Sequence, residues 1–300
     1  MITELERRLA EFVDRRSELS AFCNMLESDE KPILLVWGDE GMGKSSLLAR
    51  MMHECAQRKT PKAEVVLTET RNRDYLAIMR KIRDDIGVDF FKPFTDLVNF
   101  FTEEGYKLKI KVETTGSLSV AQGMQITQST IGDIAAVVIK DSMITIPRSD
   151  QAVPESERMA RLTDQFIENL GDATKNELLV IFFDDIQKMA EETHNWVCGE
   201  LLGAVKTGRL PKIRFVVCCH KRLSLDRHME AIVEQTELRP LQYEDIVQYL
   251  AKRGIEESHR SVLAEMLQAR YNGNPLEIAT SVDTFLQFRK KRNQESARSI

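Results

Sequence analysis

The sequence has little of what marks a fibrous or membrane-spanning chain. Its 300 residues include only 14 glycines and eight prolines, too few for a disordered or fibrous protein. No apolar run is long enough to cross a bilayer, and the first residues are charged throughout. We therefore predict a cytoplasmic protein that has no membrane partner.

Cysteine is scarce and shows no ligand pattern. The five cysteines are odd in number, and their spacing does not match that of a metal site. Buried, reduced thiols are therefore the expected state, rather than disulfides or a zinc site. The residues concerned are Cys23, Cys55, Cys198, Cys218 and Cys219.

Neither sign of charge dominates the chain. The formal net charge is -5, with 30% charged residues, so nucleic acid is not indicated as a partner. Hydrophobic residues make up 42% of the sequence. This composition suits one large domain with a sizeable core and a smaller domain beside it.

Short apolar runs alternate with helical patterns through most of the chain. Such runs are typical of strands buried on both faces, and their alternation with helices is typical of a parallel sheet. The sequence therefore predicts an α/β fold with a parallel β-sheet flanked by helices. The predicted strands are 32–37, 63–70, 177–183 and 213–220, and the predicted helices are 3–28 with a break near 12–19, 44–58, 74–87, 155–171 and 196–205.

A glycine-rich segment follows the first predicted strand. Residues 38–45, GDEGMGKS, match the pattern G-x-x-x-x-G-K-[ST] between a buried strand and a helix. In this pattern backbone N–H groups turn toward phosphate oxygens, Lys44 brings positive charge to the β- and γ-phosphates, and Ser45 offers a hydroxyl to Mg²⁺. The next helix directs its free N–H groups at the same phosphates. A chance match in a turn is the alternative, and the flanking strand and helix favour a phosphate-binding loop.

Two acids, Asp184 and Asp185, follow the apolar run 177–183. In a parallel sheet they lie at the same carboxyl edge as the glycine-rich loop, where ligands bind. We expect Asp184 to hold Mg²⁺ directly or through water. Asp185 either lies near the γ-phosphate and orients a water molecule, or caps the following helix.

Three basic residues, His220, Lys221 and Arg222, follow the strand predicted at 213–220. They are expected at the same edge of the sheet. One of them senses the γ-phosphate by its charge, or the three form a basic surface loop.

The remaining segments depart from the strand–helix alternation. Residues from about 105 to 150 begin with alternating apolar residues and continue with small polar ones, which indicates an insertion, either a hairpin or a loop. From 236 onward the pattern is helical, with Ser258 as a helix cap and Pro275 in a first helical turn. The predicted division is 1–235 for the nucleotide-binding domain, 236–290 for a helical subdomain and 291–300 for a polar tail.

Four blocks, in this order, resemble the STAND class of P-loop ATPases, relatives of the NACHT and AP-ATPase signalling switches. The likeness runs from Phe12 to Phe285 outside the insertion, with Asp14 at a position where the class has glycine. The class also has a sensor arginine for which His220 is the nearest match, with Arg222 displaced. The blocks are FVDRRSEL, GDEGMGKSS, LLVIFFDD, and ELRPLQYEDIVQYL followed by YNGNPLEI.

The resemblance implies an AAA+/ASCE-like P-loop NTPase with a small all-helical lid, binding ATP or ADP with Mg²⁺. Val13 and Arg15 would lie against the adenine and the phosphates, and Pro275 would close over the base from the lid. Lys44, Asp184 and Asp185 would act in catalysis, and Ser45 and Asp184 would hold the metal. The full set of expected nucleotide-binding residues is Val13, Arg15, Gly38, Glu40, Gly41, Met42, Gly43, Lys44, Ser45, Ser46, His220 and Pro275.

This resemblance predicts a slow ATPase that couples its nucleotide state to conformational change and assembly in signalling or defence. Its partners would be other proteins or further copies of the chain. Two other functions fit the same motifs. One is a DNA-associated ATPase similar to origin-recognition loaders, which salt-dependent DNA binding would favour. The other is a scaffold that binds nucleotide without hydrolysing it, as the unmatched sensor arginine suggests.

Overall fold

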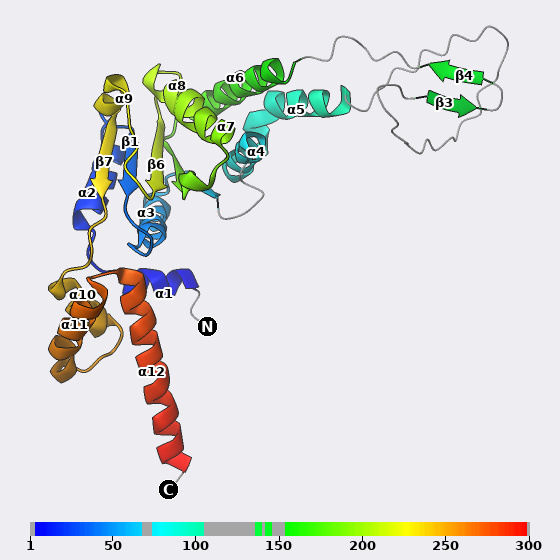
Figure 1. The fold of residues 1–300 in the computed structure, drawn as a ribbon. Helices are drawn as coiled ribbons and strands as arrows, with labels where there is room; N and C mark the ends of the chain where they lie inside the picture. The colour runs from blue at the N-terminus through cyan, green and yellow to red at the C-terminus, as the bar shows by residue number, and fades with distance from the viewer. Residues whose placement is uncertain (1–3, 68–73, 105–135, 140–141, 146–153, 299–300) are drawn as a thin grey trace. The chain divides into compact units, whose positions relative to one another are not determined.

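The computed structural model describes residues 4–67, 74–104, 136–139, 142–145 and 154–298 (Figure 1). The chain divides into two compact units, which are described separately. The first combines Met1–Phe91 with Ile167–Ile300, and the second is Lys92–Phe166.

The first unit contains a five-stranded parallel sheet. The strand order is β2-β5-β6-β1-β7, and each pair of neighbours is parallel. The predicted α/β fold with a parallel sheet is therefore confirmed. The strands are β1 (Ile33–Trp37), β2 (Lys62–Val66), β5 (Leu179–Asp184), β6 (Ile213–Cys219) and β7 (Val233–Glu237).

The position of β6 between β1 and β5 determines what meets at the carboxyl edge. Trp37, the last residue of β1, pairs with Cys219 of β6, and Phe183 of β5 pairs with Val217. The loop after β1, the acids at the end of β5 and His220 after β6 therefore lie along one edge of the sheet. This is the edge at which ligands bind in open parallel sheets.

Helices flank the sheet and close its core (Figure 1). α2 contacts β1, α3 contacts β5 and β6, and α4 contacts β2. All seven residues of β6 are buried, as expected for a central strand covered on both faces. α1 (Glu4–Glu11) contacts α3. The elements around the sheet are α2 (Arg16–Glu27), α3 (Lys44–Arg58), α4 (Tyr75–Ile86), η2 (Val88–Phe91), η3 (Ile186–Lys188), α7 (Glu191–Asn195), the π-helix η4 (Trp196–Leu201), α8 (Leu202–Lys206) and α9 (Arg227–Ile232).

Strand β7 was not predicted from the sequence. Its residues are VEQTE, and only Val233 is buried. It pairs with β1 alone, at the edge of the sheet. An edge strand need not carry the apolar run by which the central strands were recognised, and β7 carries none.

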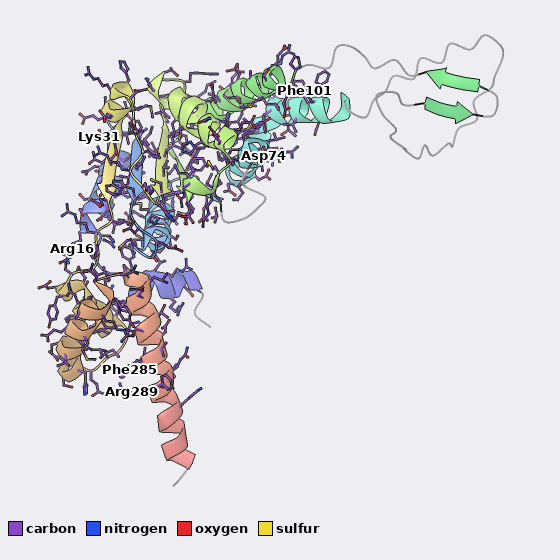
Figure 2. The ribbon with its side chains drawn as sticks, viewed as in Figure 1. Arg16, Lys31, Asp74, Phe101, Phe285 and Arg289 are labelled. Carbon is purple, nitrogen blue, oxygen red and sulfur yellow. The ribbon has the colours of Figure 1, made fainter. Side chains whose placement is uncertain are left out.

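Three helices follow the sheet and form a small core of their own. They are α10 (Tyr243–Lys252), α11 (Glu257–Tyr271) and α12 (Pro275–Arg298), and the predicted helical region is confirmed. Ile246, Leu250 and Ile278 are fully buried between them. Arg289 of α12 donates a hydrogen bond to Glu256 at the start of α11 (Figure 2). Phe285, also on α12, is 45% exposed and lies outside this core.

The helix boundaries in this region need one correction. Ser258 was expected to cap α11, but the cap position is Glu256, whose backbone is extended, and the helix begins at Glu257. Ser258 therefore lies inside the first turn. Pro275 is the first residue of α12. An N–H at this position has no partner within a helix, so proline costs no hydrogen bond there. The helix continues through 291–298, the residues expected as a polar tail.

The second unit contains α5 (Lys92–Glu104), most of α6 (Glu155–Ala173) and a two-stranded antiparallel sheet. Its strands are β3 (Ala136–Ile139) and β4 (Ser142–Thr145), near the end of the predicted insertion. The alternating residues predicted at 107–113 lie outside the described residues. Phe94 of α5 packs edge-on against Phe166 of α6, with 5.4 Å between ring centroids.

We predict that Gly273→Ala destabilises the protein far more than Gly254→Ala does. Both glycines have a positive φ, of 75° and 72°, which costs an alanine ~1–2 kcal/mol. A Cβ on Gly273 would also collide with the backbone carbonyl of Leu241, whereas one on Gly254 meets open space. In urea unfolding we expect a loss of ~3 kcal/mol or more for Gly273→Ala. Equal losses for the two variants would contradict this account.

Candidate nucleotide-binding site

The loop between β1 and α3 depends on glycine at two positions. Gly41 and Gly43 have φ values of 81° and 87°, a left-handed region that side chains rarely tolerate. A Cβ on Gly41 would also meet the side chain of Asn274. The glycines of the sequence motif are therefore required by the backbone of the loop itself.

Lys44 is the first residue of α3 and is buried, with 6% of its surface exposed. Its Nζ donates to the carbonyl oxygens of Gly38 and Asp39, at 2.7 and 2.9 Å. These bonds hold the ammonium group across the inside of the loop. The positive charge therefore lies where the loop's backbone would surround a phosphate.

Ser45 and Asp184 join α3 to β5. The Ser45 hydroxyl donates to Asp184 Oδ2 at 2.7 Å. Burial raises the pKa of Asp184, and the Ser45 hydrogen bond partly offsets this effect. Asp184 Oδ1 is buried without a hydrogen-bond partner, and an unpartnered buried carboxylate oxygen is costly unless a cation or water satisfies it.

This pair fits Mg²⁺. Among the residues that the structure describes, no cluster of three or more His, Cys, Asp and Glu side chains is placed to hold a metal ion. Magnesium does not require such a cluster, because it usually retains several waters and binds through one or two carboxylates plus substrate phosphates. Asp184 and the Ser45 hydroxyl are the residues that would hold it.

Asp185 has two hydrogen-bond donors and a histidine beside its carboxylate. Its Oδ2 accepts from Lys188 Nζ at 2.6 Å, and its Oδ1 accepts from Gln187 Nε2 at 2.9 Å and lies 3.5 Å from His220 Nε2. Burial alone would raise the pKa of Asp185, but the hydrogen bonds from Lys188 and Gln187 outweigh it and the pKa is lowered.

The alternative role of Asp185 as a side-chain helix cap is wrong. Asp185 occupies the position before the short helix η3, but its side chain makes no capping bond there. Its backbone has a φ of 62°, which is uncommon for a residue other than glycine. The left-handed backbone and the hydrogen bonds from Lys188 and Gln187 show a carboxylate held in one orientation at the edge of the sheet.

A cleft of about 600 Å³ lies over this edge. The structure therefore brings together most of the residues expected to bind nucleotide. Gly38 and Asp184 join them through their bonds to Lys44 and Ser45. The predicted residues that line the cleft are Val13, Arg15, Glu40, Gly41, Met42, Gly43, Lys44, Ser45, Ser46, Asp185, His220 and Pro275.

The basic residues after β6 have different surroundings. His220 lines the cleft and faces Asp185. Arg222 instead donates from Nε to Gln235 of β7 at 3.1 Å. His220, the nearest match to the sensor arginine of the STAND class, therefore lies in the cleft. Arg222 is bonded to β7 instead.

Arg15 holds two segments together. It is buried, with 4% of its surface exposed. Its guanidinium donates to the carbonyl of Arg239 at 2.7 Å and to that of Met42 in the glycine-rich loop at 3.0 Å. Arg15 thus fixes the loop to the segment that precedes α10, in addition to lining the cleft.

The structure also shows a contact that the sequence did not predict. The backbone N–H of Leu276 donates to the carbonyl of Gly41 at 3.2 Å, and Asn274 Nδ2 donates to the carbonyl of Glu40 at 3.3 Å. Asn274 Oδ1 also accepts from Leu276 N and Glu277 N, so it caps α12. An asparagine directly before a helix-starting proline was the available signal for the cap, but nothing in the sequence indicated the bond to the loop.

A second group of contacts that the sequence did not predict lines the cleft. Arg253 Nη1 donates to Glu11 Oε2 at 2.8 Å and to the Tyr249 hydroxyl at 3.1 Å. Its Nη2 donates to Asp283. This guanidinium connects α1, α10 and α12, which are far apart in the sequence, so no local pattern predicts their meeting.

The sequence profile of the AAA ATPase domain family matches residues 11–213. This chain belongs to that family. The match includes the glycine-rich loop, Asp184 and Asp185, and it ends where β6 begins. No curated protein matches the sequence. Within the described part of the chain, no helix has both the length and the apolar character needed to span a membrane.

The solved structures that match the chain do so at low sequence identity and with TM-scores below 0.5. Cdc6p from Pyrobaculum aerophilum is 15% identical, with 99% of this chain and 64% of that one covered and a TM-score of 0.48. A STAND protein with a tetratricopeptide repeat sensor from Pyrococcus horikoshii is 14% identical, with 89% and 29% covered and a TM-score of 0.43. Domain III of DnaA from Thermotoga maritima is 14% identical, with 95% and 89% covered and a TM-score of 0.47. The chain thus spans less than two thirds of the first two.

We predict that Arg15→Met destabilises the protein by ~2–3 kcal/mol, because the variant loses two partly buried hydrogen bonds from a charged donor to backbone carbonyls. Arg222→Met is the matched control, since Arg222 is exposed and bonds to the half-buried Gln235. Its effect should stay within ~0.5 kcal/mol. Urea unfolding of both variants measures the difference. A loss for Arg15→Met no larger than the control's would show that these carbonyls do not depend on Arg15.

Proposed function

We propose that this chain binds ATP with Mg²⁺ and hydrolyses it slowly, as a nucleotide-dependent switch of the STAND type. The observation that carries the proposal is the assembly of Lys44, Ser45 and Asp184 at one point. Lys44 lies inside the loop, and Ser45 bonds to Asp184 at 2.7 Å across the head of α3. These are the three side chains that the chemistry of a bound nucleoside triphosphate requires.

Each residue has a role in binding the triphosphate. The backbone N–H groups of the loop and of the first turn of α3 surround the phosphates, where the helix dipole favours negative charge. Lys44 neutralises charge on the β- and γ-phosphates. Ser45 and Asp184 hold Mg²⁺, which neutralises developing charge when it is bound.

The reaction is the transfer of the terminal phosphoryl group to water. The water oxygen bonds to the terminal phosphorus, and the bond from that phosphorus to the bridging oxygen breaks. ADP leaves with the electron pair, and a proton of the attacking water passes to solvent. Asp185 lies at the edge of the cleft where this water must be oriented.

Turnover should be slow. Arg222, the arginine nearest the expected sensor position, bonds to Gln235 of β7. P-loop enzymes that lack a positioned arginine, or carry a single one in the same chain, turn over at roughly 10⁻⁴ to 10⁻² per second. The nucleotide state therefore persists long enough to act as a signal.

The helices after the sheet supply the element that responds. Leu276 and Asn274 at the start of α12 bond to the carbonyls of Gly41 and Glu40 in the loop. A nucleotide that changes this loop changes the position of α12 to the extent that it binds the two positions differently. By the resemblance to the STAND class, the output is assembly of further copies or binding of protein partners in signalling or defence.

We predict that Lys44→Ala and Asp184→Ala each reduce phosphate release at least ~100-fold, because each removes a charge that acts on the triphosphate. Lys175→Ala and Asp172→Ala are matched controls, since these two residues form an exposed ion pair on the surface and should leave the rate unchanged. Equal phosphate release from the wild type and both site variants would refute ATP hydrolysis at this site.

We also predict that ATP or a non-hydrolysable analogue increases the particle mass in solution relative to ADP. The reason is that α12 is bonded to the loop that the terminal phosphate would contact. Light scattering with each nucleotide measures the mass. Identical monomers in all three conditions would contradict nucleotide-driven self-assembly, and salt-dependent DNA binding in the same samples would favour a DNA-associated ATPase instead.

A further inference from the structure

A second lysine lies at the cleft beside the one in the glycine-rich loop. Lys188 is the last residue of η3, which follows β5 directly. It lines the same cleft as Lys44, Ser45 and His220. Neither the sequence motif nor the resemblance assigned it a role.

Lys188 is held in place rather than left to solvent. Its Nζ donates to Asp185 Oδ2 at 2.6 Å, and its backbone N–H donates to the carbonyl of Asp185 at 2.9 Å. Gln187 bonds to the other oxygen of the carboxylate, so the carboxylate cannot turn away. The Lys188 side chain retains 40% of its exposure, and it is therefore accessible to a ligand in the cleft.

The charges around this lysine suit an anion. Lys188 shares the cleft with Ser45, whose hydroxyl bonds to Asp184, the residue that would hold Mg²⁺. Two of the arginines that line the cleft are already engaged, Arg15 by two carbonyls and Arg253 by Glu11 and Asp283. Among the residues that the structure describes, Lys188 pairs with Asp185, and an ammonium group can donate three hydrogen bonds.

We propose that Lys188 is a catalytic residue that contacts the terminal phosphate of ATP and that Asp185 positions it there. This inference rests on the proposed function. Lys188 distinguishes ATP from ADP, because only ATP brings a third phosphate to the end of β5. It also stabilises the charge that develops as the terminal phosphoryl group transfers to water, which is the role of a positioned cation in phosphoryl transfer.

The test compares the affinities for ADP and for a non-hydrolysable ATP analogue by titration calorimetry with Mg²⁺. Lys188→Ala should lose at least ~10-fold in affinity for the analogue, the effect of one charge-assisted hydrogen bond, and none for ADP. Lys188→Arg should retain the discrimination, because it keeps the charge. Lys175→Ala is the matched control, since Lys175 forms the same (i, i+3) pair with Asp172 at 2.8 Å on the surface.

The outcomes separate this inference from the proposed function. Equal losses for both nucleotides, or no change in either, would overturn the role of Lys188 while leaving ATP binding intact. A wild-type protein that binds neither nucleotide would overturn both. The retained ADP affinity of Lys188→Ala shows that the variant is folded, and Lys188→Gln, which keeps the side-chain length, should lose the same discrimination.

Discussion

The hydrogen bond between Ser45 and Asp184 is the interaction on which the site depends. It joins residues 139 positions apart in the sequence, one at the head of α3 and one at the end of β5. The two meet because β1 and β5 are parallel and separated by β6 alone. A different strand order would place Asp184 away from the loop, so the sheet topology is a requirement of the proposed site as much as of the core.

The central part of the fold was predictable because a strand that is buried on both faces is a continuous run of apolar residues. The strands β1, β5 and β6 are runs of apolar residues, and helix α3 begins directly after the glycines. Strand β7 was not predictable in this way, because an edge strand with one buried residue resembles a loop. Ser258 was misplaced because helix caps depend on local backbone angles, and Glu256 adopts the extended angles two residues earlier.

The site was predictable where one short segment carries the whole pattern, as residues 38–45 do. The contacts of Arg15 and Asn274 were not, because their partners are backbone carbonyls in other segments. Every residue has a backbone carbonyl, so the residue type does not indicate which carbonyl will accept a hydrogen bond. The surroundings of Asp185 could likewise not be predicted from the sequence, since His220 reaches it from the loop after β6.

The bond from Leu276 to Gly41 fixes the first turn of α12 to the glycine-rich loop. The helix has 24 residues, or a length of ~36 Å at 1.5 Å per residue, and it runs away from the sheet in Figure 1. A change in the loop would therefore tilt the helix about its first turn. A tilt of about 10° at that point would carry the far end through ~6 Å over this length. A shift of the loop too small to disturb the core would thus move the far end of α12 enough to change a surface that another molecule contacts.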